Sequence, residues 1–386
     1  MRRVLLLTYE FAPFRGGIGR VAEGLAEGAV ACGLEPIVLA PDYGGDRRAE
    51  DAGLSYEVRR FPGSFCGIGS IRRLVRFSGI CRSAIAEIRP DLVHGVDPPA
   101  QMVLAGLSRA HITRAYIITV HGTELLRYRS ELLPHLWMRQ GLARANAVCL
   151  VSHYVREHLH REFRVPRERT FVSYPGIAPA WQETAPAGRA QVRSQWGASE
   201  GDFVILTIAR VVREKGGDRV IAGLAQAPAE LRERTVYVLI GTGPESYAQE
   251  LEASAAHAGI RLVRMGSQPD EALVRACDGA DLAAMLSRQT PKRLEGLGLA
   301  YLEAGTRGVP SIACRTGGVA EAVLDGETGV LLPADADGLA VAGAITRLAN
   351  DAALRARLGA NARLHGRLFT YERHAREVYR RAGLLS

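Results

Sequence analysis

Short apolar segments of strand length alternate with helical segments along most of the chain. In the first half the apolar segments are residues 4–7, 35–40, 92–94, 116–120 and 146–152. The helical segment that follows the first of them carries Val21, Leu25, Ala29 and Val30 at spacings of three and four residues. Because strands and helices alternate, we expect a parallel sheet that is covered by helices on both faces.

This pattern stops once and then begins again. Residues 174–189 are rich in proline and show no hydrophobic period, which is typical of an inter-domain linker. Strand-like segments return at residues 203–209, 235–240, 260–265, 281–285 and 310–314. With 386 residues the chain is long enough for two cores. We therefore predict an α/β protein with two doubly wound Rossmann-like domains facing a cleft, with domains at 1–178 and 200–368 and a linker at 179–199.

The composition is that of a soluble globular protein, with 47% hydrophobic and 23% charged residues. The first apolar run, residues 4–7, is too short for a signal peptide or a membrane span, so we expect a cytoplasmic protein. Six cysteines are scattered without a C-x-x-C pair, which favours reduced thiols over disulfides or metal ligands.

The net charge of +8 is concentrated in the first half, where residues 1–180 hold 24 arginines and 17 acidic residues. Two interpretations are open. The excess indicates a polyanionic partner, an anionic membrane surface or a charged acceptor, or it is a solvated basic surface.

A glycine-rich loop, residues 15–20 (Arg-Gly-Gly-Ile-Gly-Arg), joins the first strand to the first helix. Consecutive glycines let the backbone approach an anion, and the helix N-terminus adds free N–H groups. The loop lacks the sixth-position glycine of the dinucleotide fingerprint. A tight turn without a ligand is the alternative.

In the second half, Arg210 and Lys215 flank the end of a strand, and Gly241 opens a turn after the next strand at the same edge. An arginine and a lysine on one loop can bracket a diphosphate. The chain has two lysines, Lys215 and Lys292, against 47 arginines, so an ammonium group at this loop is notable. The alternative is a solvated basic loop.

Two glutamates, Glu295 and Glu303, lie eight residues apart around a pair of glycines. If a helix begins near Leu297, the two carboxylates are separated by roughly 12 Å. That distance suits the two ends of an extended ligand better than acid–base chemistry on one bond. An acidic cap with a surface glutamate is the alternative.

Two further patterns concern a single histidine and a pair of aspartates. His121 follows a strand at the edge where ligands of such sheets bind, so it can hydrogen-bond a substrate, although most single histidines are ordinary. Asp335 and Asp337 resemble a metal-binding D-x-D, but they precede a helix and are better explained as capping residues. We predict no metal and no cofactor.

Together these motifs resemble the fourth family of retaining glycosyltransferases, which have the two-domain GT-B architecture. The matching segments are residues 16–20, 121–124, 210–216, 241–244, 295–303 and 316–321. The resemblance also implies that the final helix, residues 369–386, returns to pack on the first domain. Leu297 stands where the family commonly has phenylalanine, and residues 175–178 differ from its usual Asn-Gly-Val-Asp, so the donor stays open.

The resemblance implies roles for the matching residues. His121 and Glu295 would act on the donor sugar, His121 by orienting it and Glu295 by binding its hydroxyls. The rest of the donor would be bound by Gly17, Arg210, Lys215, Gly241, Leu297, Gly298, Leu299 and Glu303, with the cations and helix amides on the diphosphate and Glu303 on the ribose. The nucleotide sugar would be a co-substrate, and the family needs no metal because cations and helix ends neutralise the leaving diphosphate.

A basic segment, residues 59–89, interleaves arginines with apolar residues, among them Phe65, Ile68 and Phe77. Arg72, Arg73 and Arg76 could share one helix face, which would place the enzyme on an anionic membrane with a lipid-linked acceptor. An ordinary helix with a solvated basic face is the alternative.

The sequence thus predicts a retaining hexosyltransferase that uses GDP-mannose, UDP-glucose or UDP-N-acetylglucosamine and acts on a glycan, glycolipid or small-molecule acceptor in envelope polysaccharide or glycolipid synthesis. The alternatives are a sugar phosphorylase, a nucleotide-sugar epimerase, and a non-catalytic nucleotide-sugar binder. Nucleic-acid binding is not expected, because no aromatic platform accompanies the arginines.

Overall fold

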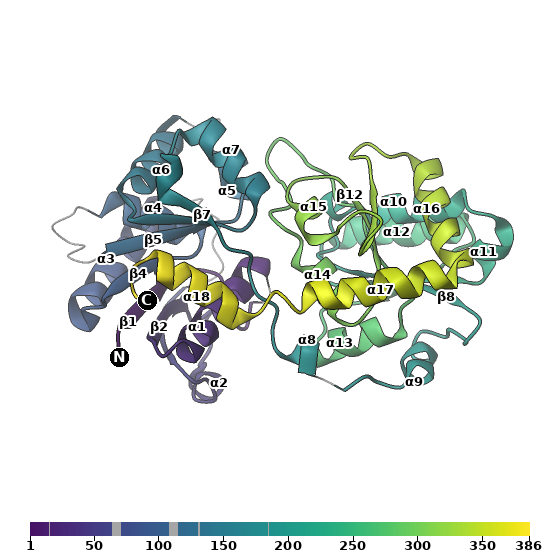
Figure 1. Cartoon of the computed structure of the whole chain (residues 1–386), viewed down its shortest axis with the longest axis horizontal. Coiled ribbons are helices and arrows are strands. Elements are labelled where there is room, and N and C mark those ends of the chain that lie inside the picture. The colour runs from purple at the N-terminus through teal and green to yellow at the C-terminus, as the bar shows by residue number, and fades with distance from the viewer. Residues whose placement is uncertain (15, 64–70, 108–114, 130–131, 184) are drawn as a thin grey trace. The chain divides into compact units, whose positions relative to one another are not determined.

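The computed structural model describes residues 1–386 except residues 15, 64–70, 108–114, 130–131 and 184 (Figure 1). The described residues form two compact units. The first unit comprises Met1–Ala178, Pro291–Gly296 and Phe369–Ser386, and the second comprises Pro179–Thr290 and Leu297–Leu368. Each unit is described by itself below.

The described part of the first unit is built on a seven-stranded parallel sheet with the order β3-β2-β1-β4-β5-β6-β7. Its strands are β1 (Arg3–Leu7), β2 (Glu35–Pro41), β3 (Glu57–Phe61), β4 (Leu92–Gly95), β5 (Ala115–Val120), β6 (Ala147–Leu150) and β7 (Thr170–Val172). The first strand pairs with both β2 and β4, so that Leu5 lies opposite Ile37 on one side and Val93 on the other. The direction of the chain across the sheet therefore reverses between β1 and β4.

Helices cover both faces of this sheet. One face packs against α3 (Ile71–Ile88), α4 (Pro98–Gly106), α5 (Thr123–Tyr128), α6 (Leu132–Arg144) and α7 (His153–Phe163). The other carries α1 (Gly17–Ala31), which lies side by side with α18 (Tyr371–Arg381). Short turns are α2 (Arg48–Asp51) and η1 (Arg167–Arg169). A Cβ on Gly28 would lie 2.3 Å from the Tyr371 carbonyl oxygen, so the two helices touch along a glycine.

Buried polar side chains lie between the sheet and α18. His94 and Thr119 alternate along their strands with residues of the opposite core, so they face α18. His94 Nε2 lies 2.7 Å from Thr119 Oγ1, and Ser173 Oγ lies 2.7 Å from His374 Nδ1 on α18. Burial lowers the pKa of both His94 and His374 to about 3, so both rings are neutral in the folded protein.

These two histidines should make the first unit less stable in mild acid. Below pH ~6.5 both histidines become protonated in the unfolded chain, whereas in the folded protein they stay neutral down to about pH 3. The free energy of unfolding therefore falls as the pH falls, by up to about 1.4 kcal/mol per pH unit for each ring. Urea unfolding between pH 7.5 and 5 measures this slope. The variant with His94→Gln and His374→Gln should have a shallower slope, and an unchanged slope would show that other groups cause it.

The described part of the second unit is a six-stranded parallel sheet with the order β10-β9-β8-β11-β12-β13. The strands are β8 (Phe203–Ile208), β9 (Thr235–Ile240), β10 (Arg261–Met265), β11 (Leu282–Met285), β12 (Ser311–Cys314) and β13 (Gly329–Leu332). The helices are α8 (Ala180–Glu183), α9 (Arg189–Ser194), η2 (Arg213–Lys215), α10 (Gly217–Ala225), α11 (Ala229–Glu233), α12 (Glu245–His257), α13 (Asp270–Gly279), α14 (Leu299–Thr306), α15 (Val319–Ala322), α16 (Gly338–Asn350) and α17 (Ala352–Gly366). The direction of the chain reverses between β8 and β11.

The segment expected as a linker, residues 179–199, packs within the second unit. Trp181 is fully buried and Trp196 nearly so. The buried guanidinium of Arg193 pairs with Asp281 at 2.5 Å and donates to the Gly279 carbonyl at 3.0 Å. Two buried tryptophans and a buried ion pair therefore fix this segment to the second unit, although its prolines indicated a flexible linker.

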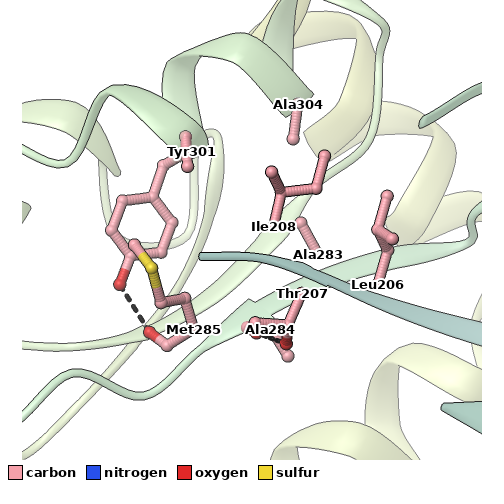
Figure 2. A pocket seen from close by; sticks show the side chains of 9 residues that line it. Leu206, Thr207, Ile208, Ala283, Ala284, Met285, Tyr301 and Ala304 are labelled. Atoms are coloured by element: carbon pink, nitrogen blue, oxygen red, sulfur yellow. Dashed lines mark hydrogen bonds between the residues drawn. The ribbon is translucent and has the colours of Figure 1, made fainter. Parts of the chain in front are cut away.

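A small cavity lies between β8, β11 and α14 in the second unit (Figure 2). Apolar groups of Leu206, Ala284 and Ala304 line it, and the Tyr301 hydroxyl donates to the Met285 carbonyl at its edge. The space is about 10 Å³, which is room for at most one water molecule. We regard it as a packing defect behind α14 and not as a substrate site.

The architecture predicted from the sequence is confirmed: both sheets are parallel and doubly wound. Three strands were not predicted, namely β3, β7 and β13. All three lie at sheet edges, and β3 (Glu-Val-Arg-Arg-Phe) is polar while β7 has three residues. A polar or very short edge strand lacks the continuous apolar run of a central strand. The third, β13 (Gly-Val-Leu-Leu), is apolar but directly follows a turn-like segment, residues 325–328.

Candidate functional site

In the first unit, the glycine loop lies where the chain direction reverses in the sheet. The loop follows β1, and α1 begins at Gly17 without a side-chain cap. Parallel sheets bind ligands at the carboxyl ends of the strands beside such a reversal. A Cβ on Gly17 would meet no atom within 4 Å, so packing inside the protein does not require glycine there and the position is open to a ligand. Arg15, part of the same motif, lies outside the described residues.

A buried aspartate that was not predicted holds the segment between β1 and this loop. The Asp97 carboxylate follows β4 and accepts hydrogen bonds from the Ala100 N–H at 3.0 Å, the Thr8 hydroxyl at 3.1 Å and the Glu10 N–H at 3.1 Å. Burial raises the pKa of Asp97, and these donors oppose that shift. An aspartate before two prolines is a helix N-cap signature that could have indicated this residue.

His121 follows β5 and is fixed by the backbone. Its Nε2 lies 2.7 Å from the Val96 carbonyl oxygen, which can only accept a hydrogen bond. Nε2 therefore carries the proton in the neutral ring, and Nδ1 presents a lone pair. The backbone N–H of His121 donates to Glu124 Oε1 at 2.6 Å, and the Gln101 amide donates to the same oxygen at 3.3 Å.

Glu124 is 2% exposed, and its carboxylate accepts from the backbone N–H of His121, so we expect it to position His121. Glu124→Ala should lower kcat about 10- to 100-fold, because the His121 backbone N–H and the Gln101 amide lose an acceptor and the His121 ring shifts with its backbone. Nucleotide affinity should stay nearly unchanged, because the cations and helix amides predicted for the diphosphate belong to the second unit. Steady-state kinetics with nucleotide titrations separate the two effects.

Glu168→Ala, on an exposed carboxylate of η1, is the control and should leave kcat unchanged. A Glu124→Ala enzyme with wild-type kcat would remove the positioning role.

The loop that carries Glu295 packs on the His121 segment of the first unit. The Thr123 hydroxyl donates to the Leu294 carbonyl at 3.3 Å, and the Ser152 hydroxyl donates to the Gly296 carbonyl at 2.7 Å. A Cβ on Gly296 would lie 2.2 Å from the His121 carbonyl oxygen, which explains glycine at this position. The structure therefore brings together the Glu295 loop and His121, two segments far apart in sequence.

In the second unit, the loop after β8 carries Arg210 and Lys215. It turns through Gly216, whose φ is +75° and whose Cβ would lie 2.1 Å from the Leu286 carbonyl oxygen. The Arg288 guanidinium donates two hydrogen bonds of 2.8 and 2.7 Å to the Asp218 carboxylate and a third of 2.9 Å to the Arg213 carbonyl. This ion pair, which was not predicted, fixes the loop against the segment that follows β11.

Gly241 lies after β9 against the same loop. Its φ is +145°, and a Cβ there would lie 1.9 Å from the Ala209 carbonyl oxygen. The next glycine, Gly243, would place a Cβ 1.8 Å from the Val211 carbonyl oxygen. Close backbone approach requires both glycines, so Gly241 has a structural role whether or not it also meets a ligand.

The helix α14 begins at Leu299, two residues later than expected. Gly298 precedes it with a φ of +94° and no side-chain cap, so the first amides of the helix lack a side-chain acceptor. A glycine in the left-handed region delays the first helical turn past Leu297. Glu303 lies one turn into the helix and is 6% exposed.

The candidate residues of the second unit therefore gather at one edge of its sheet. Arg210, Lys215, Gly241 and the N-terminus of α14 follow β8, β9 and β11, which are neighbours in the order β9-β8-β11. This edge lies at the reversal between β8 and β11, the usual ligand position in such sheets. Two cations and uncapped helix amides can bind a diphosphate there.

Of the two aspartates at residues 335 and 337, Asp337 caps a helix. Asp337 accepts a hydrogen bond from the Ala340 N–H at 2.9 Å at the start of α16, which confirms the capping interpretation. Within the described ranges, no group of three or more histidine, cysteine, aspartate or glutamate side chains is arranged to hold a metal ion.

Two family models match the chain: Glycosyltransferase Family 4 over residues 15–181 and Glycosyl transferases group 1 over residues 188–365. A GDP-mannose-dependent alpha-(1-6)-phosphatidylinositol monomannoside mannosyltransferase from Mycolicibacterium smegmatis is 31% identical over 345 residues, which are 85% of each chain. The chain belongs to glycosyltransferase family 4. As a member of this family it is a glycosyltransferase that transfers a hexose.

A further relative and two solved structures are similar to nearly the whole chain. A GDP-mannose-dependent monoacylated alpha-(1-6)-phosphatidylinositol monomannoside mannosyltransferase from Corynebacterium glutamicum is 27% identical over 94% of this chain and 93% of its own. The structure of Anabaena HepE in complex with UDP and glucose superposes with a TM-score of 0.82 at 20% identity over the full length of both chains. Sucrose-phosphate synthase from Thermosynechococcus elongatus gives 0.84 at 22% identity, with 99% of each chain covered. These two structures show the GT-B fold.

Proposed function

We propose that this glycosyltransferase moves mannose from GDP-mannose to a lipid-linked acceptor with an inositol-type headgroup, and that it retains the anomeric configuration. The observation that carries the proposal is the 31% identity, over 85% of both chains, to a GDP-mannose-dependent enzyme whose acceptor is a phosphatidylinositol monomannoside. Three further relatives at 27–28% identity bear names of the same kind.

The donor diphosphate would be held by the second unit. Arg210 and Lys215 supply positive charge, and the backbone N–H groups of Leu297, Gly298 and Leu299, at the start of α14 and just before it, would supply hydrogen-bond donors. Their charge would stabilise the phosphate that leaves, so the chain needs no metal ion for this step. Glu303, one turn into α14, would bind the ribose hydroxyls.

The sugar would be held by residues of the first unit. The Nδ1 lone pair of His121 accepts a hydrogen bond from a sugar hydroxyl, because Nε2–H is already committed to the Val96 carbonyl. Glu295 accepts from further sugar hydroxyls, and Gly17 leaves room for the phosphates. The bond between the anomeric carbon and the phosphate oxygen breaks, and an acceptor hydroxyl attacks from the same face. The acceptor proton passes to the leaving phosphate oxygen.

A membrane contact is the second part of the proposal. Arg72, Arg73 and Arg76 on α3 are exposed and can attract an anionic lipid surface. Their apolar neighbour Phe77 is fully buried against the sheet, so α3 itself packs as an ordinary helix. Phe65 and Ile68 of the same segment lie outside the described residues. We place the enzyme in the cytoplasm at the inner face of the membrane, in glycolipid assembly.

Donor choice can be tested by thermal shift with GDP, UDP, ADP and their sugars, all in EDTA. A ligand that binds the native state raises Tm with the logarithm of its concentration over Kd. We expect GDP and GDP-mannose to give the largest shift. A shift with the uridine series alone would move the donor to the class bound by HepE, and no shift with any sugar nucleotide would overturn the proposed donor site.

A further inference from the structure

The first two turns of α6 expose large apolar side chains to solvent. Leu132 is 73% exposed, Leu133 76%, Leu136 47% and Trp137 37%. The opposite side of the same helix is anchored, since Met138 and Leu142 are buried in the core. The four residues, called the α6 patch below, account for most of the exposed large apolar side chains among the described residues of the first unit. Packing within the unit does not explain them.

Exposed arginines lie close to this patch in the sequence. Arg127 and Arg129 lie at the end of α5, and Arg139 lies one turn after Leu136 on α6. The two helices α3 and α6 flank α4 on the same face of the sheet, and both begin at the carboxyl ends of the strands. Two helix spacings, roughly 20 Å, thus separate the axes of α3, which carries Arg72 and Arg76, and α6.

We propose that the α6 patch inserts into the interface of an anionic lipid bilayer and anchors the first unit there. Leucine and tryptophan beside arginine is the composition of a helix that lies in the plane of a membrane interface. The arginines favour anionic lipid over a second copy of this chain, because an isologous dimer through the patch would bring the same cations face to face. The inference rests on the lipid-linked acceptor proposed above.

In the described ranges, no helix is both long and apolar enough to cross a bilayer.

The chain contains its own probe for this contact. Of its three tryptophans, Trp181 and Trp196 are buried in the second unit and Trp137 is exposed in the patch. Adding vesicles of phosphatidylcholine with about 30 mol% phosphatidylglycerol should shift the emission of Trp137 to shorter wavelength. The Trp137→Phe variant should lose the shift and still sediment with the vesicles.

Sedimentation of a triple variant tests the patch itself. Leu132→Ser, Leu133→Ser and Leu136→Ser together should weaken vesicle binding at least about ten-fold, because three leucines no longer leave water. The matched control replaces Leu339, Leu364 and Leu368 of the second unit by serine, since these are exposed to 67%, 64% and 54%. This control should bind vesicles as the wild type does.

Two outcomes would overturn the anchor. One is equal sedimentation of the wild type and the α6 triple variant. The other is a dimer in light scattering that the triple variant dissolves, which would make a second copy the occupant. The Tm shift with GDP should be the same in wild type and triple variant. If the wild type does not bind vesicles while the triple variant still binds GDP, the membrane anchor is wrong and the donor assignment is unaffected.

Discussion

Lys215→Ala should lower kcat/KM for the nucleotide sugar about 100- to 1,000-fold. The ammonium group lies on the loop after β8, and the uncapped start of α14 follows β11, the neighbouring strand. A leaving diphosphate would develop charge between them. A preorganised cation that meets this charge contributes more to the transition state than to the bound donor. The loss should therefore appear largely in kcat, with a smaller rise in the Kd for the free nucleotide.

Arg347→Ala is the control for this prediction. Arg347 is exposed near the end of α16 and therefore lies at the opposite edge of the sheet. Its kinetics should match the wild type. Lys215→Arg should recover part of the rate, because the guanidinium keeps the positive charge but spreads it over a larger planar group than the compact ammonium. A Lys215→Ala enzyme within three-fold of wild type would contradict the diphosphate role.

The second large effect concerns stability. Gly241→Ala should lower the free energy of unfolding of the second unit by about 3 kcal/mol or more. The new Cβ would lie 1.9 Å from the Ala209 carbonyl oxygen, on a residue whose φ is +145°. The backbone of the β8 loop would have to move, so nucleotide affinity should fall as well. Urea unfolding and a GDP titration measure both effects.

A glycine that lacks both constraints provides the comparison. A Cβ on Gly343, in the exposed part of α16, would meet no atom within 4 Å. Gly343→Ala should stabilise the unit by up to about 1 kcal/mol, because alanine favours a helix. If Gly241→Ala were as stable as Gly343→Ala, the backbone approach at Ala209 would not be the reason for glycine.

The central strands and the glycine-bearing loops could be predicted from the sequence because their signals are local. An apolar run such as residues 203–208 can be predicted as a strand without knowledge of its partners. A capping aspartate such as Asp337 can be predicted in the same way. The contacts that support the candidate site could not be predicted from the sequence. The bond from His121 to the Val96 carbonyl joins the ends of two strands, and the Arg288–Asp218 pair joins the segment after β11 to the first turn of α10, 70 residues away.

The segment around Glu295 shows the same limit. Its two glutamates read as one motif, yet residues 291–296 pack in the first unit and α14 belongs to the second. Contacts of Leu294 and Gly296 with Thr123 and Ser152 decide this division. No local pattern encodes those partners, because hydroxyl donors to backbone carbonyls leave no period in the sequence.

The most direct test of the proposed function is the anomeric configuration of the product formed from GDP-mannose and a phosphatidylinositol monomannoside in EDTA. Nuclear magnetic resonance of the purified glycolipid gives the coupling at the new anomeric carbon. The proposal predicts transfer of mannose with the configuration it had in the donor. An inverted product, or transfer from UDP-glucose with none from GDP-mannose, would contradict it.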